Sequence, residues 1–299
     1  MVSCAVIGSN GYLGKHLVEY LRHKGMAVSC YDICNVDANH GRCIDITDKR
    51  TLAGIDLDVD LIFMFAGITG TYAGFANYSL YNNINEIGLI NLLDTIRNSQ
   101  YRPKVVFPSS RLVYKGVDRP LKETDTKECK TIYAVNKLAC ENLLWTYRCS
   151  FDIPFTVFRI CVPYGNLLPG PTSYGTIGHF IHQAADGKDI TLYGGGLIKR
   201  TFTYIEDLCD QIVRCSMKNE SNGEAYNIGG ETLSLRQVAS MIAKLYNTNV
   251  VSVPWPEADL RIESDSTYFD DTKIQSLLGA IEYKRFADYL SDVANISLK

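Results

Sequence analysis

The N-terminal half of the chain alternates short apolar runs with longer amphipathic segments. The amphipathic segments predict a helix with Leu13, Leu17 and Leu21 on one face, and long helices over 81–97 and 131–150. Strands that are apolar throughout, with helices between them, are typical of a parallel sheet covered on both faces. The pattern therefore predicts a doubly wound α/β fold. The predicted strands are Val2–Ile7, Ala27–Tyr31, Leu61–Phe65, Lys104–Pro108 and Phe155–Ile160.

The pattern changes after Cys161, where residues 162–178 are rich in Gly, Pro, Ser and Thr. We expect residues 1–161 to form the main domain and residues 162–299 a smaller C-terminal lobe. Two further predicted strands, Thr201–Ile205 and Ala225–Ile228, could rejoin the main sheet, so the main domain would include parts of 201–230. The helices predicted for the lobe are Gly178–Ala185, Glu206–Met217, Leu235–Tyr246 and Phe286–Ala294.

Composition narrows the class of protein. The chain has 299 residues, of which 46% are hydrophobic, and this balance is typical of a globular enzyme. Its formal net charge of −3 gives no electrostatic argument for nucleic-acid binding. No apolar stretch is long enough to cross a membrane, and no leader segment is recognisable, so we expect a cytoplasmic protein. The ten cysteines include no Cys-x-x-Cys pair, and Cys30, Cys34 and His40 match no zinc spacing. We expect reduced thiols and no bound metal.

A glycine-rich loop, residues 8–14, lies between the first predicted strand and the first predicted helix. Such a loop lets the backbone approach a pyrophosphate at the N-terminus of the helix, which is the Rossmann-type dinucleotide site. Asp32 follows at the end of the second strand, where a carboxylate accepts hydrogen bonds from the adenosine ribose and repels a 2′-phosphate. The predicted cofactor is therefore NAD rather than NADP. The candidate binding residues in this loop are Gly8, Asn10, Gly11, Tyr12, Leu13 and Gly14.

Three residues suggest hydride-transfer chemistry. Tyr133 and Lys137 are four residues apart on one predicted helix, and Ser110 follows the strand Lys104–Pro108 at the edge where parallel sheets bind ligands. In this chemistry a hydride leaves the carbon that carries the hydroxyl group. A base that works near neutral pH is needed to remove the hydroxyl proton at the same time. A tyrosine with its usual pKa near 10 needs about 4 kcal/mol of phenolate stabilisation for that role. The Lys137 ammonium and the positive nicotinamide ring are the plausible sources, and Ser110 would hold the reacting oxygen.

With these motifs in place, the chain resembles the extended short-chain dehydrogenase/reductase family, in particular its nucleotide-sugar epimerases and dehydratases. The resemblance runs from Gly8 to about Gly279. It implies that Asp45, Ile46, Phe65, Ala66, Gly67 and Asn85 contact NAD, together with Tyr133 and Lys137. Beyond the glycine loop, the matching elements are Asp45-Ile46, Ala66-Gly67, Asn85 to Gly88, Ser109 to Tyr114, Tyr133 to Glu141 and Arg159 to Gly165.

The resemblance also implies a substrate class. Arg200 begins an element that ends at Asp207, and Arg261 precedes Asp271-Thr272-Lys273; in the family, arginines at these two places bind the nucleotide diphosphate. A guanidinium suits that group because it forms bidentate, charge-assisted hydrogen bonds.

Three departures from the family pattern stand out. Met64 replaces a frequent histidine, and Val162 replaces an asparagine that often contacts the phosphate. Arg111-Leu112 replaces the Asp-Glu pair with which the 4,6-dehydratases eliminate water, which argues against that reaction.

The expected function is an NAD-dependent nucleotide-sugar epimerase that works through a transient 4-keto sugar, with Tyr133 as the base. A nucleotide-sugar 4-dehydrogenase or ketoreductase using NAD(P) would need the same residues and stays open as an alternative. A non-catalytic dinucleotide sensor on the same fold is a third interpretation. The expected partner is a nucleotide-diphosphate sugar. The resemblance further implies a homodimer, formed by the two long helices over 81–97 and 131–150.

Overall fold

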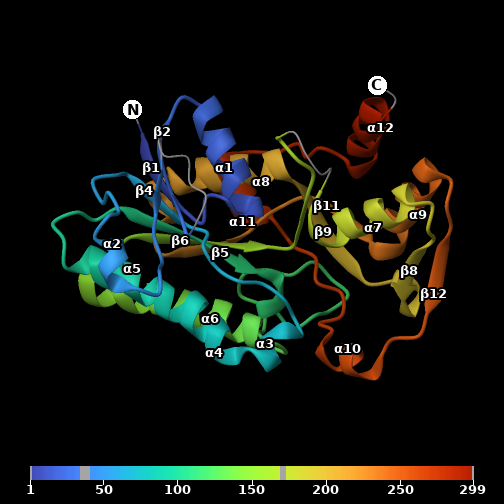
Figure 1. The fold of residues 1–299 in the computed structure, drawn as a ribbon, viewed down its shortest axis with the longest axis horizontal. Coiled ribbons are helices and arrows are strands. Elements are labelled where there is room, and N and C mark those ends of the chain that lie inside the picture. The colour runs from blue at the N-terminus through green and yellow to red at the C-terminus, as the bar shows by residue number, and fades with distance from the viewer. Residues whose placement is uncertain (1, 34–40, 169–172, 298–299) are drawn as a thin grey trace.

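The computed structural model describes residues 2–33, 41–168 and 173–297. Its centre is a seven-stranded sheet with the order β10-β6-β5-β4-β1-β2-β3, in which every neighbouring pair is parallel (Figure 1). The chain starts in the middle of the sheet and winds outward in both directions, so the predicted doubly wound fold is confirmed. The strands are β1 (Ser3–Ile7), β2 (Ala27–Asp32), β3 (Gly41–Cys43), β4 (Leu61–Met64), β5 (Lys104–Ser110), β6 (Phe155–Ile160) and β10 (Glu224–Asn227).

Helices cover both faces of this sheet. One face carries α1 (Tyr12–His23), α8 (Ile205–Ser216) and α11 (Thr272–Leu278), and the opposite face carries α5 (Gly88–Arg97) and α6 (Ile132–Phe151) (Figure 1). Helix α6 (Ile132–Phe151) begins where the Thr131 hydroxyl accepts a hydrogen bond from the Ala134 amide, and it ends at Asp152 in the left-handed conformation. Short elements complete this part of the chain: α2 (Lys49–Leu52), α3 (Ala73–Ala76), η2 (Arg111–Val113) and η4 (Asn219–Ser221).

The predicted helix over 81–97 contains an irregularity that the sequence pattern did not indicate. It consists of α4 (Tyr78–Asn82), a π-helical turn η1 (Asn83–Ile87) and α5 (Gly88–Arg97) in direct succession. A π turn inserts one extra residue and shifts the faces of the helix on either side of it. Asn85, in this turn, is buried and points at the loop after β4 rather than at solvent.

The C-terminal lobe contains two small sheets. Three strands, β7 (Val162–Tyr164), β9 (Lys199–Tyr204) and β11 (Glu231–Ser234), form one, and β8 (Ile190–Tyr193) pairs with β12 (Val250–Val253) in the other. Of the two segments expected to be able to rejoin the main sheet, only β10 does so. Strand β9 pairs instead with β7, which follows β6 after a single residue, and with β11. The remaining elements are η3 (Gly194–Gly196), α7 (Gly175–Ala185), α9 (Leu235–Tyr246), α10 (Glu257–Ile262) and α12 (Phe286–Ser297).

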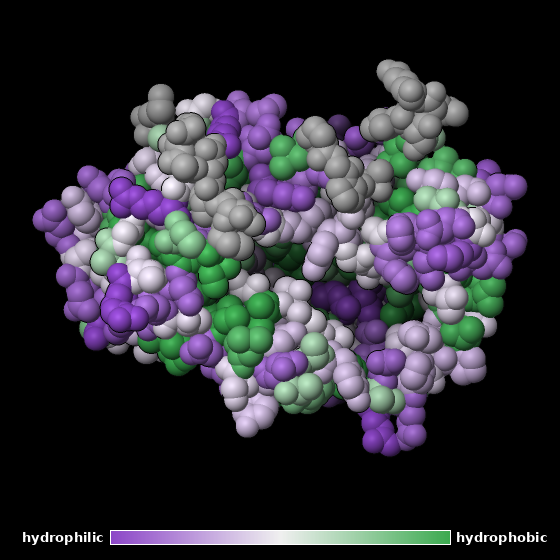
Figure 2. Space-filling model, in the orientation of Figure 1, coloured by the Kyte–Doolittle hydropathy of each residue, from purple (hydrophilic) through white to green (hydrophobic). Residues whose placement is uncertain are grey.

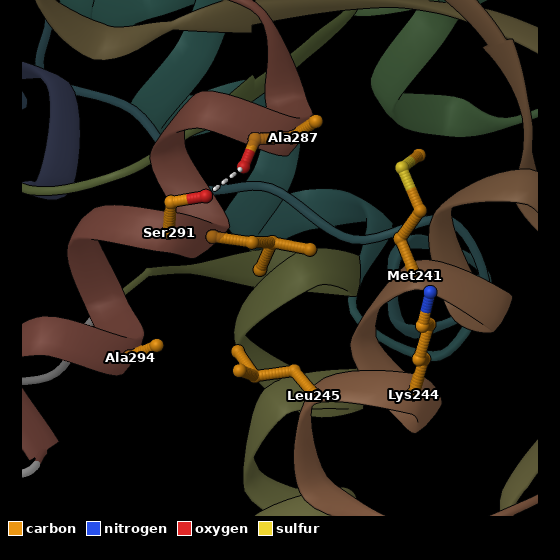
Figure 3. Close-up of a pocket in the computed structure, with 7 residues that line it drawn as sticks. Met241, Lys244, Leu245, Ala287, Ser291 and Ala294 are labelled. Atoms are coloured by element: carbon orange, nitrogen blue, oxygen red, sulfur yellow. Dashed lines mark hydrogen bonds between the residues drawn. The ribbon is translucent and has the colours of Figure 1, made fainter.

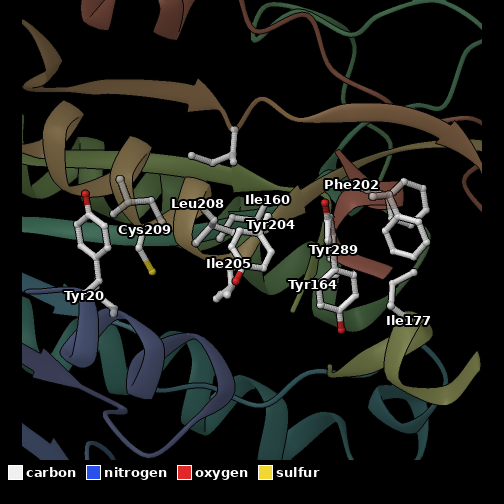
Figure 4. Close-up of a cluster of buried hydrophobic side chains, with 14 of the residues drawn as sticks. Tyr20, Ile160, Tyr164, Ile177, Phe202, Tyr204, Ile205, Leu208, Cys209 and Tyr289 are labelled. Carbon is white, nitrogen blue, oxygen red and sulfur yellow. The ribbon is translucent and has the colours of Figure 1, made fainter. Parts of the chain in front are cut away.

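One hydrophobic cluster joins the main sheet to the lobe (Figure 4). Tyr20 of α1 and Ile160 of β6 belong to it, as do Tyr164 and Phe202 of the three-stranded sheet and Tyr289 of α12. The aromatic rings are in direct contact, with Tyr164 and Tyr289 centroids 5.1 Å apart. The interior is therefore continuous across the junction at residue 161, and the lobe is fixed over the carboxyl ends of the sheet strands.

Among the described residues, no helix is long and apolar enough to cross a membrane. The same residues contain no group of three or more His, Cys, Asp and Glu side chains that could hold a metal ion. Cys34 and His40, named above for their spacing, lie outside the described residues.

Candidate active site

The glycine loop is packed too tightly to accept side chains at two of its positions. Gly8 has a φ of +89°, and a Cβ there would lie 2.4 Å from the backbone nitrogen of Ala66, at the end of β4. A Cβ on Gly14 would lie 2.0 Å from the Gly8 carbonyl oxygen. Both distances are far below van der Waals contact, so glycine at these positions brings the loop, α1 and β4 together.

The N-terminus of α1 offers a place for a pyrophosphate. Gly11 caps the helix without a side-chain hydrogen bond, and no described residue accepts a hydrogen bond from the amides of Tyr12 or Leu13. Free amides at the positive end of a helix dipole suit an anion. Asp32 fixes the loop beside them, because its carboxylate accepts hydrogen bonds from the Asn10 and Ile33 amides, both at 2.8 Å. These residues fit the cofactor site that the sequence predicted.

The remaining predicted cofactor residues surround the ends of β4 and the segment after β3. Asn85 holds the loop that follows Phe65, Ala66 and Gly67, since its side chain accepts a hydrogen bond from the Ile68 amide and donates one to the Ile68 carbonyl. Asp45 accepts two hydrogen bonds from Thr47, and Ile46 is buried against Gly88. Asn85, Asp45 and Ile46 therefore shape the walls of the site through the backbone that they hold.

Ser110, Tyr133 and Lys137 come together at the carboxyl end of β5. Ser110 is the last residue of β5, and its side chain is close enough to Tyr133 to act on the pKa of the phenol. Burial raises the pKa of Tyr133, and the neighbouring Ser110 side chain partly opposes this rise. The Lys137 ammonium lies 5.7 Å from the centre of the Tyr133 ring and 4.4 Å from that of Phe107. Burial lowers the pKa of Lys137 to about 8.

This arrangement has the parts needed for proton transfer to and from a hydroxyl. A phenol that is beside a serine and close to an ammonium can act as base and acid in turn, provided that positive charge stabilises its phenolate. Tyr133 and Lys137 are on the first turns of α6, and Ser110 is on the neighbouring strand, so the sheet and one helix set their relative positions.

Beneath Ser110, an ion pair holds β5, β6 and α6 in register. The Arg159 guanidinium donates to both carboxylate oxygens of Glu141, at 3.0 and 2.6 Å. Glu141 also accepts a hydrogen bond from Ser109 at 2.5 Å, and Arg159 donates one to the Tyr114 hydroxyl at 2.7 Å. All four residues were part of the sequence resemblance, but only the structure assigns them this positioning role.

The two arginines predicted to bind substrate are in very different surroundings. Arg200 is 2% exposed and donates to the Glu263 carboxylate at 2.6 Å and to the carbonyls of Lys199 and Asp265. Burial lowers the pKa of Arg200 to about 10. Arg261 is on α10 with its side chain 74% exposed, where it pairs with Glu257 one helical turn earlier. Arg200 is therefore buried, whereas Arg261 is at the surface.

Sequence reasoning assigned no binding role to the arginine beside Ser110. Arg111 begins η2 and donates 2.9 Å hydrogen bonds to the hydroxyls of Ser264 and Thr267, in the segment after α10. It joins the main sheet to the C-terminal lobe next to Ser110. Its place in the sequence, directly after Ser110 and in the position of the dehydratase carboxylate, was the signal that could have identified it. Met64 and Val162, the other two departures, are strand residues, and Met64 is buried in the core.

The surface is hollowed between the main domain and the lobe, and both hydrophilic and hydrophobic residues are visible in the hollow (Figure 2). A second, open groove lies between α9 and α12, on the lobe alone (Figure 3). None of the predicted site residues lines this second groove, so it is separate from the active site. Its lining residues are Met241, Lys244, Leu245, Ala287, Leu290, Ser291 and Ala294.

Comparison with known proteins gives a consistent result. A family model described as the NAD-dependent epimerase/dehydratase family matches residues 4–229. A UDP-N-acetyl-α-D-glucosaminuronate decarboxylase from Bacillus cytotoxicus is 28% identical over 271 residues, covering 84% of this chain and 83% of that protein. A UDP-glucuronate 4-epimerase from Thermodesulfobacterium geofontis is 26% identical over 298 residues, covering 91% and 89%.

Solved structures share the fold over the whole chain. The structure of a UDP-glucuronic acid 4-epimerase from Bacillus cereus, in complex with UDP-glucuronic acid and NAD, superposes with a TM-score of 0.83 at 22% identity and covers 100% of both chains. A UDP-glucose 4-epimerase from Thermus thermophilus, in complex with NAD, gives 0.83 at 21% identity and covers 98% of both.

Proposed function

Because this chain belongs to the NAD-dependent epimerase/dehydratase family, we propose that it inverts one carbon of a nucleotide-diphosphate sugar through a transient 4-keto sugar. The observation that carries the proposal is the grouping of Ser110, Tyr133 and Lys137 at the same sheet edge as the glycine loop. The enzyme depends on NAD, and the loop and Asp32 fit that cofactor.

In the proposed mechanism, NAD held by the glycine loop and Asp32 would supply the hydride acceptor and donor for the sugar carbon. Tyr133 removes the proton from the hydroxyl of that carbon and later gives it back, while Ser110 holds the oxygen by a hydrogen bond. Lys137 stabilises the phenolate by its charge, because its ammonium is close to the Tyr133 ring and no described residue accepts a hydrogen bond from it. A 4-dehydrogenase or ketoreductase would use the same three residues and stop after one hydride transfer.

The named relatives guide the choice of substrate. Both sequence relatives described above are named for UDP-linked uronates. We therefore propose a UDP-sugar as the substrate and place UDP-glucuronate first among those to be tested. We propose that the hollow between the main domain and the lobe is the substrate pocket (Figure 2).

We also propose that two chains associate through the helices on the α5 and α6 face. Exposed apolar side chains are present along both helical segments, among them Leu80, Ile87, Val135 and Trp145. Apolar surface of this kind on neighbouring helices is typical of a protein interface. A single species of twice the chain mass in sedimentation would agree with this homodimer. A cytoplasmic location stays a prediction from the sequence.

The test begins with the cofactor and a panel of UDP-, dTDP-, GDP- and CDP-sugars. We expect purified protein to retain NAD and to isomerise at least one sugar with no net NADH. Turnover only with stoichiometric NAD(H) or NADPH would instead establish a dehydrogenase or reductase.

The variant Tyr133→Phe then tests the base. We expect it to retain NAD but lose at least a thousandfold in kcat, because the ring stays and the proton acceptor is removed. Tyr147→Phe is the matched control, since Tyr147 is on the same helix and donates its hydroxyl proton to Asp94. Full activity in Tyr133→Phe would contradict the assignment of the base.

A further inference from the structure

We propose that Arg111 directly binds an anionic group of the substrate; this inference rests on the proposed nucleotide-sugar function. The anionic group is a carboxylate or phosphoryl group, which presents two or three oxygens to one guanidinium. Sequence reasoning gave the substrate contact to Arg200 and Arg261 and none to Arg111.

Both terminal nitrogens of Arg200 already have acceptors within the protein. One of its terminal nitrogens donates to the carbonyls of Lys199 and Asp265, and the other donates to Glu263. With 2% of its surface exposed, Arg200 has little room to contact a ligand. To bind a diphosphate directly, it would have to release the Glu263 carboxylate, its only ion-pair partner among the described residues.

Arg111 is in the opposite situation. One terminal nitrogen, Nη1, donates to the hydroxyls of Ser264 and Thr267, which fixes the plane of the guanidinium. Its other two nitrogens have no acceptor among the described residues, and no described carboxylate lies within 4.0 Å of it. A partly buried guanidinium, oriented by two neutral hydroxyls and lacking a counterion, leaves its remaining donors for a ligand.

The surrounding charges favour an anion at this place. Arg111 is close enough to Arg200 for its charge to act on it, and the Lys130 ammonium donates to the Glu263 carbonyl at 2.8 Å. Among these three cations, only Arg200 forms an ion pair with a described carboxylate, that of Glu263. Like charges gathered in a partly dehydrated pocket repel one another, and an anionic ligand would relieve that repulsion.

The position of Arg111 in the chain connects this anion to the reaction. It directly follows Ser110, whose hydroxyl we assign to the reacting oxygen of the sugar. The anion is therefore within one arginine side chain of the reacting carbon. Two groups of a nucleotide sugar meet that condition: a carboxylate on the sugar ring and the diphosphate. Both offer paired oxygens to the free edge of the guanidinium.

The experiment measures binding of UDP, UDP-glucose and UDP-glucuronate by calorimetry to NAD-loaded wild type and Arg111→Gln. Glutamine keeps a donor for Ser264 and Thr267 but removes the charge. We expect Arg111→Gln to weaken binding at least tenfold. A loss confined to UDP-glucuronate would identify the sugar carboxylate as the anion, and an equal loss for all three ligands would identify the diphosphate. Arg119→Gln is the control, because Arg119 is an exposed arginine paired with Asp125.

Unchanged affinity of Arg111→Gln for all three ligands would overturn the inference and leave the proposed function standing. Wild type that binds none of them, nor any other nucleotide sugar, would overturn both. Arg111→Lys provides a second reading if the glutamine variant does not fold, because it keeps the charge and loses the planar pair of donors. We expect it to bind several-fold more weakly than wild type; unchanged binding to all three ligands would overturn the bidentate contact.

Discussion

Lys137 lowers the stability of the cofactor-free protein, and removing it should make the fold more stable. Its ammonium is buried, contacts the Phe107 ring, and has no described hydrogen-bond acceptor. A pKa displaced by burial from 10.5 to about 8 corresponds to roughly 3 kcal/mol against the charged form. Replacement by methionine keeps the unbranched chain and removes the charge. The lost cation–π attraction offsets about 1 kcal/mol of the gain.

We therefore expect Lys137→Met to raise the free energy of unfolding by about 2 kcal/mol at pH 7. The sign of the pH dependence follows from proton binding. Below pH 8 both the folded and the unfolded wild type carry the proton, so the full cost is present. Between about pH 8 and 10.5 only the unfolded state holds it, so wild-type stability rises with pH. By pH 9.5 the cost of the charge should have fallen to roughly half, and with it the advantage of the variant.

The assay is urea unfolding of NAD-free wild type and variant at pH 7 and pH 9.5, together with kcat for both. Lys104→Met is the matched control. Lys104 is also buried with a pKa lowered to about 8, but its ammonium donates to the carbonyls of Ser216 and Lys218 and to the Ser221 hydroxyl. Its removal leaves those acceptors unpaired and should destabilise the fold. A Lys137→Met variant that is inactive but no more stable than wild type at pH 7 would refute the reasoning.

Two further predictions concern the residues that support the site. Glu141→Gln leaves the Arg159 guanidinium without its carboxylate, so we expect the free energy of unfolding to fall by about 3 kcal/mol in urea unfolding; a loss below about 1 kcal/mol would show that the pair is not essential. Gly14→Ala places a Cβ 2.0 Å from the Gly8 carbonyl and should open the loop. We expect purified Gly14→Ala to contain little NAD when the released nucleotide is measured, and retention at the wild-type level would contradict this packing.

The sequence pattern was sufficient to predict the elements that follow a simple periodic rule. Continuous apolar strands such as Lys104–Pro108 alternate with helices, and this predicted the parallel sheet. The position of the glycine loop between strand and helix, and of Ser110 after a strand, predicted which groups share the sheet edge. These relations depend on local periodicity and on one topological rule, so they can be read without coordinates.

Other features depend on contacts between distant segments and were not accessible in this way. The partner of Arg200 is Glu263, which is 63 residues later, and the hydroxyls that hold Arg111 are more than 150 residues away from it. The π turn at Asn83–Ile87 leaves the apolar pattern of the helix almost unchanged while it turns Asn85 inward. Strand β9 resembled a main-sheet strand because its burial is the same in either sheet.

The hydrophobic cluster that crosses residue 161 determines what happens when the chain is cut there or when the protein unfolds. Cutting the chain there would expose Ile160 on one fragment and Tyr164, Phe202 and Tyr289 on the other, all buried in the intact protein. Neither fragment has an alternative apolar surface to cover them, so each would aggregate instead of persisting as an independent domain. We therefore expect the two lobes to unfold as one cooperative unit, and protease cleavage of the native protein to be confined to its surface loops.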